Sequence, residues 1–384
     1  MIYFDNSATT KIDPEVLKTY NLAANEFWGN PSSLHKLGTH AHNLLQQARE
    51  QIASLVHVKS SEIYFTSGGT ESDNWVIKGT AWAKREFGKH IITTSIEHAA
   101  VLNPIHQLEE LGYDVTYLPV DHRGFVNPED VRKAMRKDTI LVSIMAVNNE
   151  IGSIQPLDEI GEILEDYPNV HYHVDAVQAV GKGLEKHVFG PRVDFASFSS
   201  HKFHGPRGVG ILYARAGKKI ESLIDGGGQE AGLRSGTENL PAIAAMAKAW
   251  RLELTNEDEH VKKQQAIRAK IYNHIKNFSR VTLFSELTPD FAPHILCFAI
   301  NGVRGETIVH AFEEKGIYIS TTSACSSKNG EAAGTLKQMG VQMDIATSAV
   351  RISLDENNTL AEADAFNRAF DDIYHRFEKV SFEK

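Results

Sequence analysis

Short apolar segments alternate with helical patterns through the first two thirds of the chain. Residues 63–65, 90–94, 113–118, 139–147, 170–174 and 193–198 are apolar and of a length typical of buried strands. Helical patterns separate several of them, for example at 157–167. This alternation, from about residue 62 to 215, predicts an α/β fold whose mainly parallel central sheet carries helices on both faces. Ligands of such sheets bind at the carboxyl ends of the strands.

The segments before residue 62 and after residue 215 contain patterns that predict further helices and strands. Asp13 followed by Pro14 indicates a helix start, and a second helix is expected over 41–56. A long helical pattern from roughly 241 to 279 leads into a smaller α+β part, with strands near 281, at 295–300 and at 317–319. We therefore expect a large domain of residues 15–255, and a small domain of residues 1–14 and 256–384.

Composition narrows the classes of protein to consider. The chain has 384 residues, of which 42% are hydrophobic and 23% charged, as in ordinary globular proteins. Its formal net charge of −9 argues against a dedicated nucleic-acid surface, so we expect no direct nucleic-acid partner. No apolar run approaches the roughly 18 residues of a membrane span, and the first residues do not resemble a signal peptide. A cytoplasmic protein without membrane contact is expected.

The stretch 193–210 carries the strongest chemical signal. A predicted strand ends in Ser199, Ser200, His201 and Lys202, and a run rich in glycine follows, where the backbone must turn. Asp175 ends the preceding strand. A carboxylate and a lysine at neighbouring strand ends can pair with a pyridinium nitrogen and form a Schiff base, respectively. An isolated lysine of this kind would more often be an ordinary solvated side chain.

Several sequence motifs around these residues support this interpretation. HVDAVQAVGK (residues 173–182) and FSSHKFHGPRGVG (198–210) resemble the cofactor core of the NifS/IscS-type cysteine desulfurases, which are pyridoxal-phosphate (PLP) enzymes of aminotransferase class V. The resemblance runs from DNSATT (5–10) to AVRISL (349–354). It implies a type I PLP-dependent transferase fold. It also implies that L-cysteine is converted to L-alanine, and that the sulfur passes through an enzyme persulfide to an acceptor protein for iron–sulfur cluster assembly or tRNA thiolation.

The resemblance also assigns roles to residues. Lys202 would bind PLP covalently and move protons, with Asp175 at the ring nitrogen and His98 stacked on the ring as a proton relay. Arg351 and Asn149 would bind the substrate carboxylate. Thr237 would reach the phosphate of a neighbouring subunit, which implies a homodimer. The remaining cofactor contacts would come from Gly69, Thr70, Asn149, Gln178, Ser199 and His201. Independently, the glycines before a helix at residue 69 suit phosphate, although they do not form a Walker loop.

The two cysteines predict different roles. Cys297 lies in an apolar strand pattern and is expected in the core. Cys325 lies in a small polar run, STTSACSSKNG (320–330), so the resemblance makes it the sulfur-accepting nucleophile. The active form of such a cysteine is the thiolate. Thr322 stands where the family often has glycine, a departure that bears on how this loop moves.

Alternatives remain open at this point. Another class V enzyme, such as a selenocysteine lyase or an aminotransferase, shares most of these motifs. A non-catalytic scaffold is opposed by the presence of Lys202, Asp175, His98, Arg351 and Cys325. Metal binding is a further possibility to weigh, because histidines form two close pairs, His171/His173 and His201/His204. No HExxH motif or Cys–His cluster accompanies them. We therefore expect structural or cofactor-linked histidines and no metal.

Overall fold

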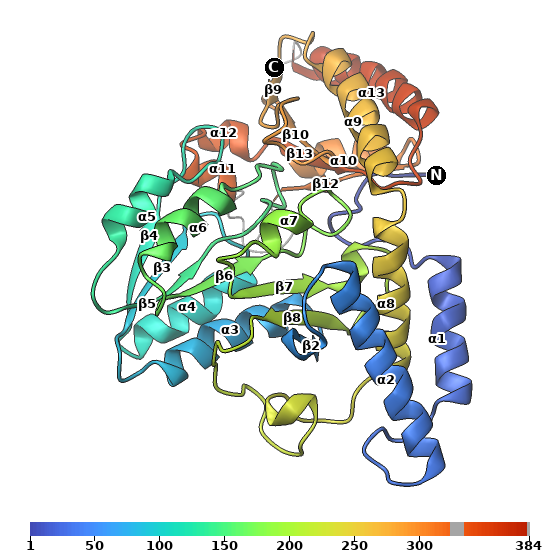
Figure 1. Cartoon of the computed structure of the whole chain (residues 1–384). Helices are drawn as coiled ribbons and strands as arrows, with labels where there is room; N and C mark the ends of the chain where they lie inside the picture. Colours follow the sequence, from blue (N-terminus) through green and yellow to red (C-terminus); the bar gives the residue numbers. More distant parts are fainter. Residues whose placement is uncertain (323–333, 382–384) are drawn as a thin grey trace.

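A seven-stranded sheet forms the centre of the molecule (Figure 1). The computed structural model describes residues 1–322 and 334–381. Along the sheet the order is β2 (Ile63–Thr66), β8 (Gly210–Ala214), β7 (Phe195–Ser199), β6 (His171–Asp175), β5 (Thr139–Ser143), β3 (His90–Thr94) and β4 (Asp114–Leu118). Strand β8 runs antiparallel to both neighbours, and all other neighbouring strands pair in parallel. The predicted mainly parallel sheet is thereby confirmed.

Consecutive strand residues pack alternately into two hydrophobic clusters, one on each face of the sheet. On β5, Leu141 packs with α3 (Gly69–Ala83) and α4 (Ala99–Glu110), whereas Val142 packs toward the opposite helices. On β7, Phe195 likewise packs in the cluster with α3 and α4, and Ala196 packs in the cluster on the opposite face. Successive side chains of a strand point to opposite faces, so strands buried on both sides read as continuous apolar runs.

The second face is covered by helices from distant parts of the chain. These are α1 (Pro14–Glu26), α2 (Lys36–Leu55), α6 (Leu157–Glu165) and α8 (Leu240–Leu254), and Figure 1 shows α1, α2 and α8 side by side. The predicted start of α1 is confirmed, because Oδ1 of Asp13 accepts hydrogen bonds from the amides of Glu15 (2.7 Å) and Val16 (3.2 Å). Shorter helices α5 (Pro128–Ala134) and α7 (Glu185–Val188) connect the strands.

The C-terminal part of the chain forms a second, smaller sheet with helices packed against it. Its antiparallel sheet has the order β12 (Ser320–Thr321), β13 (Ala349–Ser353), β10 (Ile295–Ile300) and β9 (Val281–Leu283). Helices α9 (Glu257–Ile275), α10 (Gly305–Glu313) and α13 (Leu360–Ser381) pack on it around an aromatic cluster. The N-terminal strand β1 (Ile2–Tyr3) pairs with β11 (Ile317–Tyr318) in this part. Two short helices, α11 (Gly334–Gln338) and α12 (Met343–Ala346), also belong to it, and α12 contacts β10. The domain boundaries proposed from sequence stay a prediction.

The single helix expected over 241–279 is wrong, because the structure has two. Helix α8 ends at Leu254 and α9 begins at Glu257. Between them, Thr255 is extended and Asn256 adopts φ 67°, a left-handed conformation that asparagine tolerates better than most residues. The break lets α8 pack on the large sheet while α9 packs beside α13 (Figure 1). Among the described residues, no helix is both long and apolar enough to cross a membrane.

Candidate active site

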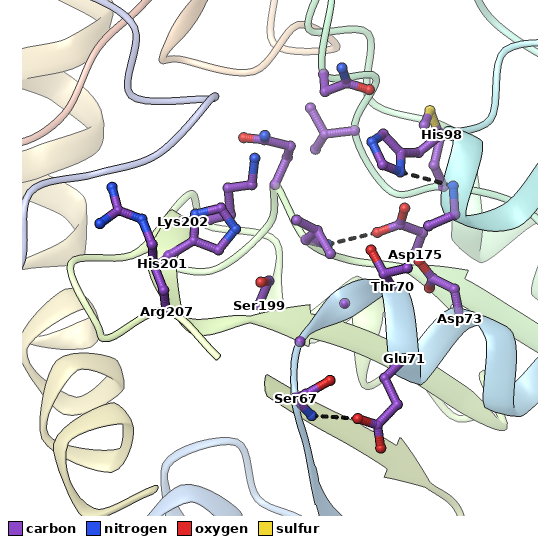
Figure 2. Close-up of a pocket in the computed structure, with 18 of the residues that line it drawn as sticks. Ser67, Thr70, Glu71, Asp73, His98, Asp175, Ser199, His201, Lys202 and Arg207 are labelled. Atoms are coloured by element: carbon purple, nitrogen blue, oxygen red, sulfur yellow. Dashed lines mark hydrogen bonds between the residues drawn. The ribbon is translucent and has the colours of Figure 1, made fainter. Parts of the chain in front are cut away.

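A cavity of about 350 Å³ lies at the carboxyl ends of the parallel strands (Figure 2). Its walls follow β2, β3, β5, β6 and β7, and they include residues from each segment that the sequence marked as polar. The structure brings together nine residues predicted as site residues: Gly69, Thr70, His98, Asn149, Asp175, Gln178, Ser199, His201 and Lys202. Residues far apart in the chain therefore meet because parallel strands end at one edge of a sheet.

One wall of the cavity is the start of α3. No side chain of the described residues caps this helix, so its first amide N–H groups are available to an anion. Gly68 has φ 154°, a conformation that favours glycine. A Cβ on Gly69 would lie 2.6 Å from Cγ2 of Val177, so glycine is needed for the helix to approach the segment after β6. The start of α3 is thus shaped for a phosphate group.

Lys202 is held against the N-terminal segment. Its Nζ donates to the carbonyl oxygens of Ser7 (2.6 Å) and Ala8 (3.0 Å). The DNSATT motif is therefore more than a connector, since its backbone positions the amine that the sequence singled out. Thr9 continues this contact, with its Oγ1 lying 3.1 Å from Nδ1 of His201 and accepting a hydrogen bond from Arg207 at 3.3 Å.

His201 stays uncharged near neutral pH. Burial lowers its pKa to about 4, and the positive charges of Lys202 and Arg207 add to that effect. The neutral imidazole can therefore pack beside Lys202 without adding a further positive charge.

Three buried carboxyl groups meet at one side of the cavity, and two of them, Asp73 and Asp175, line it. Burial raises the pKa of Asp73 to about 7 and that of Glu97 to about 8, and burial together with the charge of Asp73 raises the pKa of Asp175. Oδ1 of Asp73 and Oε2 of Glu97 have no hydrogen-bond partner among the described residues. In Figure 2, Asp73 and Asp175 lie close together beside the start of α3. This side of the cavity is therefore prepared for a cationic or proton-donating group.

His98 lies across the cavity from Lys202 and starts α4. Its Nδ1 accepts a hydrogen bond from the amide of Ala100 at 3.1 Å, so Nε2 carries the proton of the neutral ring. Figure 2 shows the ring next to Asp175. Gln178 is oriented by two contacts, because its Nε2 donates to Ser7 O (3.1 Å) and its Oε1 lies 3.3 Å from Nε2 of His294.

Arg351 lies on β13 of the second sheet; it does not line the cavity but contacts the lining residue Asn149. Its side chain is only 6% exposed, and its guanidinium donates to the carbonyl of Asn149 (2.7 Å) and to Oδ1 of Asp5 (3.0 Å). Nε of Arg351 is buried without a hydrogen-bond partner among the described residues. A guanidinium next to the predicted substrate residue Asn149 suits the binding of a carboxylate.

Among the described residues, Thr237 and Cys297 do not line the cavity. Thr237 is exposed on the loop before α8, which leaves it able to reach a neighbouring chain, as the homodimer prediction requires. Cys325 lies outside the described residues. Cys297 is fully buried on β10, and burial, followed by the charge of Glu150, raises the pKa of its thiol well above the usual value. The expected core role of Cys297 is confirmed.

Several lining residues, among them Asp73 and Arg207, are not predicted from the sequence. Asp73 lies in the second turn of α3, where an acidic residue would ordinarily face solvent. Its position after the Gly68–Gly69 turn was the available signal, since this places it on the side of the helix that faces the sheet. Arg207 lies five residues after Lys202, but the glycine-rich pattern does not indicate how the backbone turns there or which way the Arg207 side chain points.

PLP fits the groups that line this cavity. The open start of α3 suits its phosphate, and the ring nitrogen in its protonated form would supply the positive charge that the buried carboxyl groups lack. Lys202 offers the amine for the covalent link, and His98 offers a flat ring for stacking. The donor set thus contains one suitable partner for each functional part of the cofactor.

Comparison with known proteins agrees with this arrangement. Residues 2–366 match the model of the aminotransferase class-V family. The chain is 62% identical to a "NifS/IcsS protein homolog" of Lactobacillus delbrueckii subsp. bulgaricus, with 99% of both chains covered. It is 43% identical to the cysteine desulfurase IscS of Dictyoglomus turgidum, covering 92% of this chain and 89% of the relative. A solved "NifS-like protein" superposes with a TM-score of 0.90 at 41% identity, covering 97% of this chain and 98% of the other. The chain therefore belongs to the aminotransferase class-V family, within its group of NifS/IscS-type cysteine desulfurases.

Proposed function

We propose that this enzyme removes sulfur from L-cysteine with PLP bound to Lys202, and that Cys325 receives the sulfur. The observation that carries the proposal is the single cavity that joins the open start of α3 to Asp175, His98 and Lys202. When bound, PLP supplies an electron-withdrawing ring that stabilises negative charge at the substrate's α-carbon.

Each side chain has a stated task in this proposal. Arg351, held by Asp5 and Asn149, binds the substrate carboxylate and so fixes the orientation of the α-carbon. The amine of Lys202 takes the α-proton, and His98 moves a proton at Nε2. Asp175 would stabilise the protonated ring nitrogen of the bound cofactor. The amide of Gln178 would contact the ring oxygen.

Sulfur transfer uses the thiolate of Cys325. The thiolate sulfur attacks the substrate's sulfur, the carbon–sulfur bond breaks, and its electron pair stays with the substrate carbon. Protonation of that carbon yields L-alanine, and the enzyme keeps a persulfide. Cys325 then passes the terminal sulfur to an acceptor protein that serves iron–sulfur cluster assembly or tRNA thiolation. We place this reaction in the cytoplasm, where thiols are kept reduced.

The proposal includes a homodimer in which Thr237 contacts the phosphate bound by the other chain. The exposure of Thr237 on its own chain supports this arrangement. Thr237→Ala should weaken PLP binding without weakening dimer formation. Full PLP binding by separated monomers would contradict the shared site.

Two variants test the core of the proposal. Lys202→Ala should lose the visible absorbance of the lysine-linked cofactor, and retention of that absorbance would exclude Lys202. Cys325→Ala should keep the absorbance but release no sulfide or alanine from L-cysteine. If this variant still desulfurises cysteine, or acts only on selenocysteine or by transamination, the proposed reaction is wrong and another class V activity takes its place.

A further inference from the structure

A second group of ionisable side chains lies beneath the lysine-bearing turn. His204 follows Lys202 by two residues, and Asp355 and Glu356 follow strand β13 in the other sheet. Nε2 of His204 lies 3.1 Å from Oε2 of Glu356 and 3.6 Å from Oδ2 of Asp355. The ligand atoms of these three residues all lie within 4.8 Å of one another. Glu253 on α8 adds a carboxylate, with Oε1 3.8 Å from the same nitrogen.

These separations suit a shared ion. Nitrogen and oxygen ligands lie about 2.1 Å from a tetrahedral zinc ion, so neighbouring ligand atoms are roughly 3.4 Å apart. The distances of 3.1 and 3.6 Å from Nε2 of His204 to the oxygens of Glu356 and Asp355 bracket that separation. Nδ1 of His204 lies 2.8 Å from the carbonyl oxygen of Lys11. Donation of the Nδ1 proton to this carbonyl would leave the lone pair of Nε2 directed at the carboxylates, which is the usual orientation of a metal-bound histidine.

Two carboxylates in the cluster have few or distant partners. Oε2 of Glu356 is shielded from solvent and has no hydrogen bond among the described residues, although Nε2 of His204 is 3.1 Å away. The two atoms are therefore close without the alignment of a hydrogen bond, as two ligands of one ion would be. The side chain of Glu253 is 4% exposed, and its ion-pair partners, Nε2 of His204 and Nζ of Lys182, lie 3.8 and 3.9 Å away. Carboxylates buried in this way require a compensating positive charge.

We propose that His204, Asp355 and Glu356 bind a divalent cation, with the carboxylate of Glu253 as a neighbouring negative charge. One imidazole with two carboxylates is compatible with zinc, which would complete its coordination with water, and manganese is a weaker competitor. The ion would connect the turn after Lys202 to the segment after β13, and so would hold the two sheets in a fixed relation around the active site. This proposal departs from the expectation from sequence that no metal is bound, because it makes His204 a ligand.

A proton on His204 is the rival occupant. Burial alone would lower the pKa of His204, but the carboxylates of Glu356, Glu253 and Asp355 outweigh it and raise the pKa to about 9. An imidazolium ion would then neutralise part of the cluster without any metal. Direct measurement of bound metal separates the two cases.

The test uses the PLP-loaded enzyme, dialysed against a chelator and then titrated with zinc chloride. We expect one zinc ion per chain by elemental analysis after equilibrium dialysis, together with a higher thermal midpoint. His204→Gln and Glu356→Gln should each weaken zinc binding about 100-fold or more, since each removes a direct ligand. Cys325→Ser is measured in parallel so that zinc on the active-site thiol is not counted.

A matched control comes from the surface. His187 and Asp158 form a histidine–carboxylate pair at 2.6 Å, with side chains 34% and 53% exposed. His187→Gln should leave zinc binding unchanged. The proposal is overturned if the wild-type enzyme binds no stoichiometric zinc, or if His204→Gln and His187→Gln bind it equally well. Loss of thermal stability in His204→Gln without zinc binding by the wild type would assign the cluster to the proton alone.

Discussion

Replacing Arg351 by glutamine should weaken substrate binding by a calculable amount. The side chain is 6% exposed and is fixed by Asn149 O at 2.7 Å and Asp5 Oδ1 at 3.0 Å, so its guanidinium is oriented before the substrate arrives. A hydrogen bond to a charged group contributes about 1.5–3 kcal/mol. At about 1.4 kcal/mol per factor of ten, its loss corresponds to a roughly 10- to 150-fold rise in KM for L-cysteine.

The assay is steady-state alanine and sulfide production by the PLP-saturated variant. A carboxylate contact made equally in the ground and transition states changes KM more than kcat. Arg351→Lys should fall between the wild type and Arg351→Gln, because lysine keeps the charge but loses the planar fork. Arg376→Gln, which breaks an exposed pair with Glu314, should be neutral. A KM within twofold of wild type in Arg351→Gln would refute the assignment.

Three further outcomes follow from the structure. Gly69→Ala should weaken PLP binding, because the new Cβ would lie 2.6 Å from Cγ2 of Val177, and Val177→Ala should restore part of the affinity in fluorescence titrations. Cys297→Ala should keep kcat and lower the free energy of unfolding by about 1 kcal/mol in urea titrations, since this thiol is only a packed core group; loss of sulfide production would contradict that role. In the cofactor-free enzyme, Asp73 has a pKa of about 7, against 3.8 when unfolded, because of burial. The stability linked to its protonation is therefore lost as pH rises between these values, and Asp73→Asn should become more stable relative to wild type by up to about 4 kcal/mol over that interval; a parallel pH dependence would contradict it.

The parts of the site that sequence predicted best are those fixed by strand ends. Lys202, Asp175 and His98 each follow an apolar run, and parallel pairing brings such ends to one edge of the sheet. The helix start at Gly69 could be predicted for a similar reason, because two glycines before a helix mark both a turn and a close approach. These features depend on local pattern and on a topology with few alternatives.

What sequence missed depends on contacts between distant segments. The break before α9 is set by packing on two different sheets, and the helical pattern continues across Asn256 without a clear stop signal. Asp73 and Glu97 are buried because distant segments pack around them, and the sequence near each residue does not indicate this packing. The approach of His204 to Glu356 joins residues over 150 positions apart, and no local spacing indicates it.

Mass spectrometry of peptides after incubation with L-cysteine tests the proposed sulfur transfer most directly. The enzyme is reacted with cysteine, alkylated and digested, and each cysteine peptide is checked for one added sulfur atom. We expect the added sulfur on the peptide that contains Cys325, and none in Lys202→Ala. Added sulfur on Cys297, or on Cys325 in the absence of Lys202, would contradict the proposed transfer.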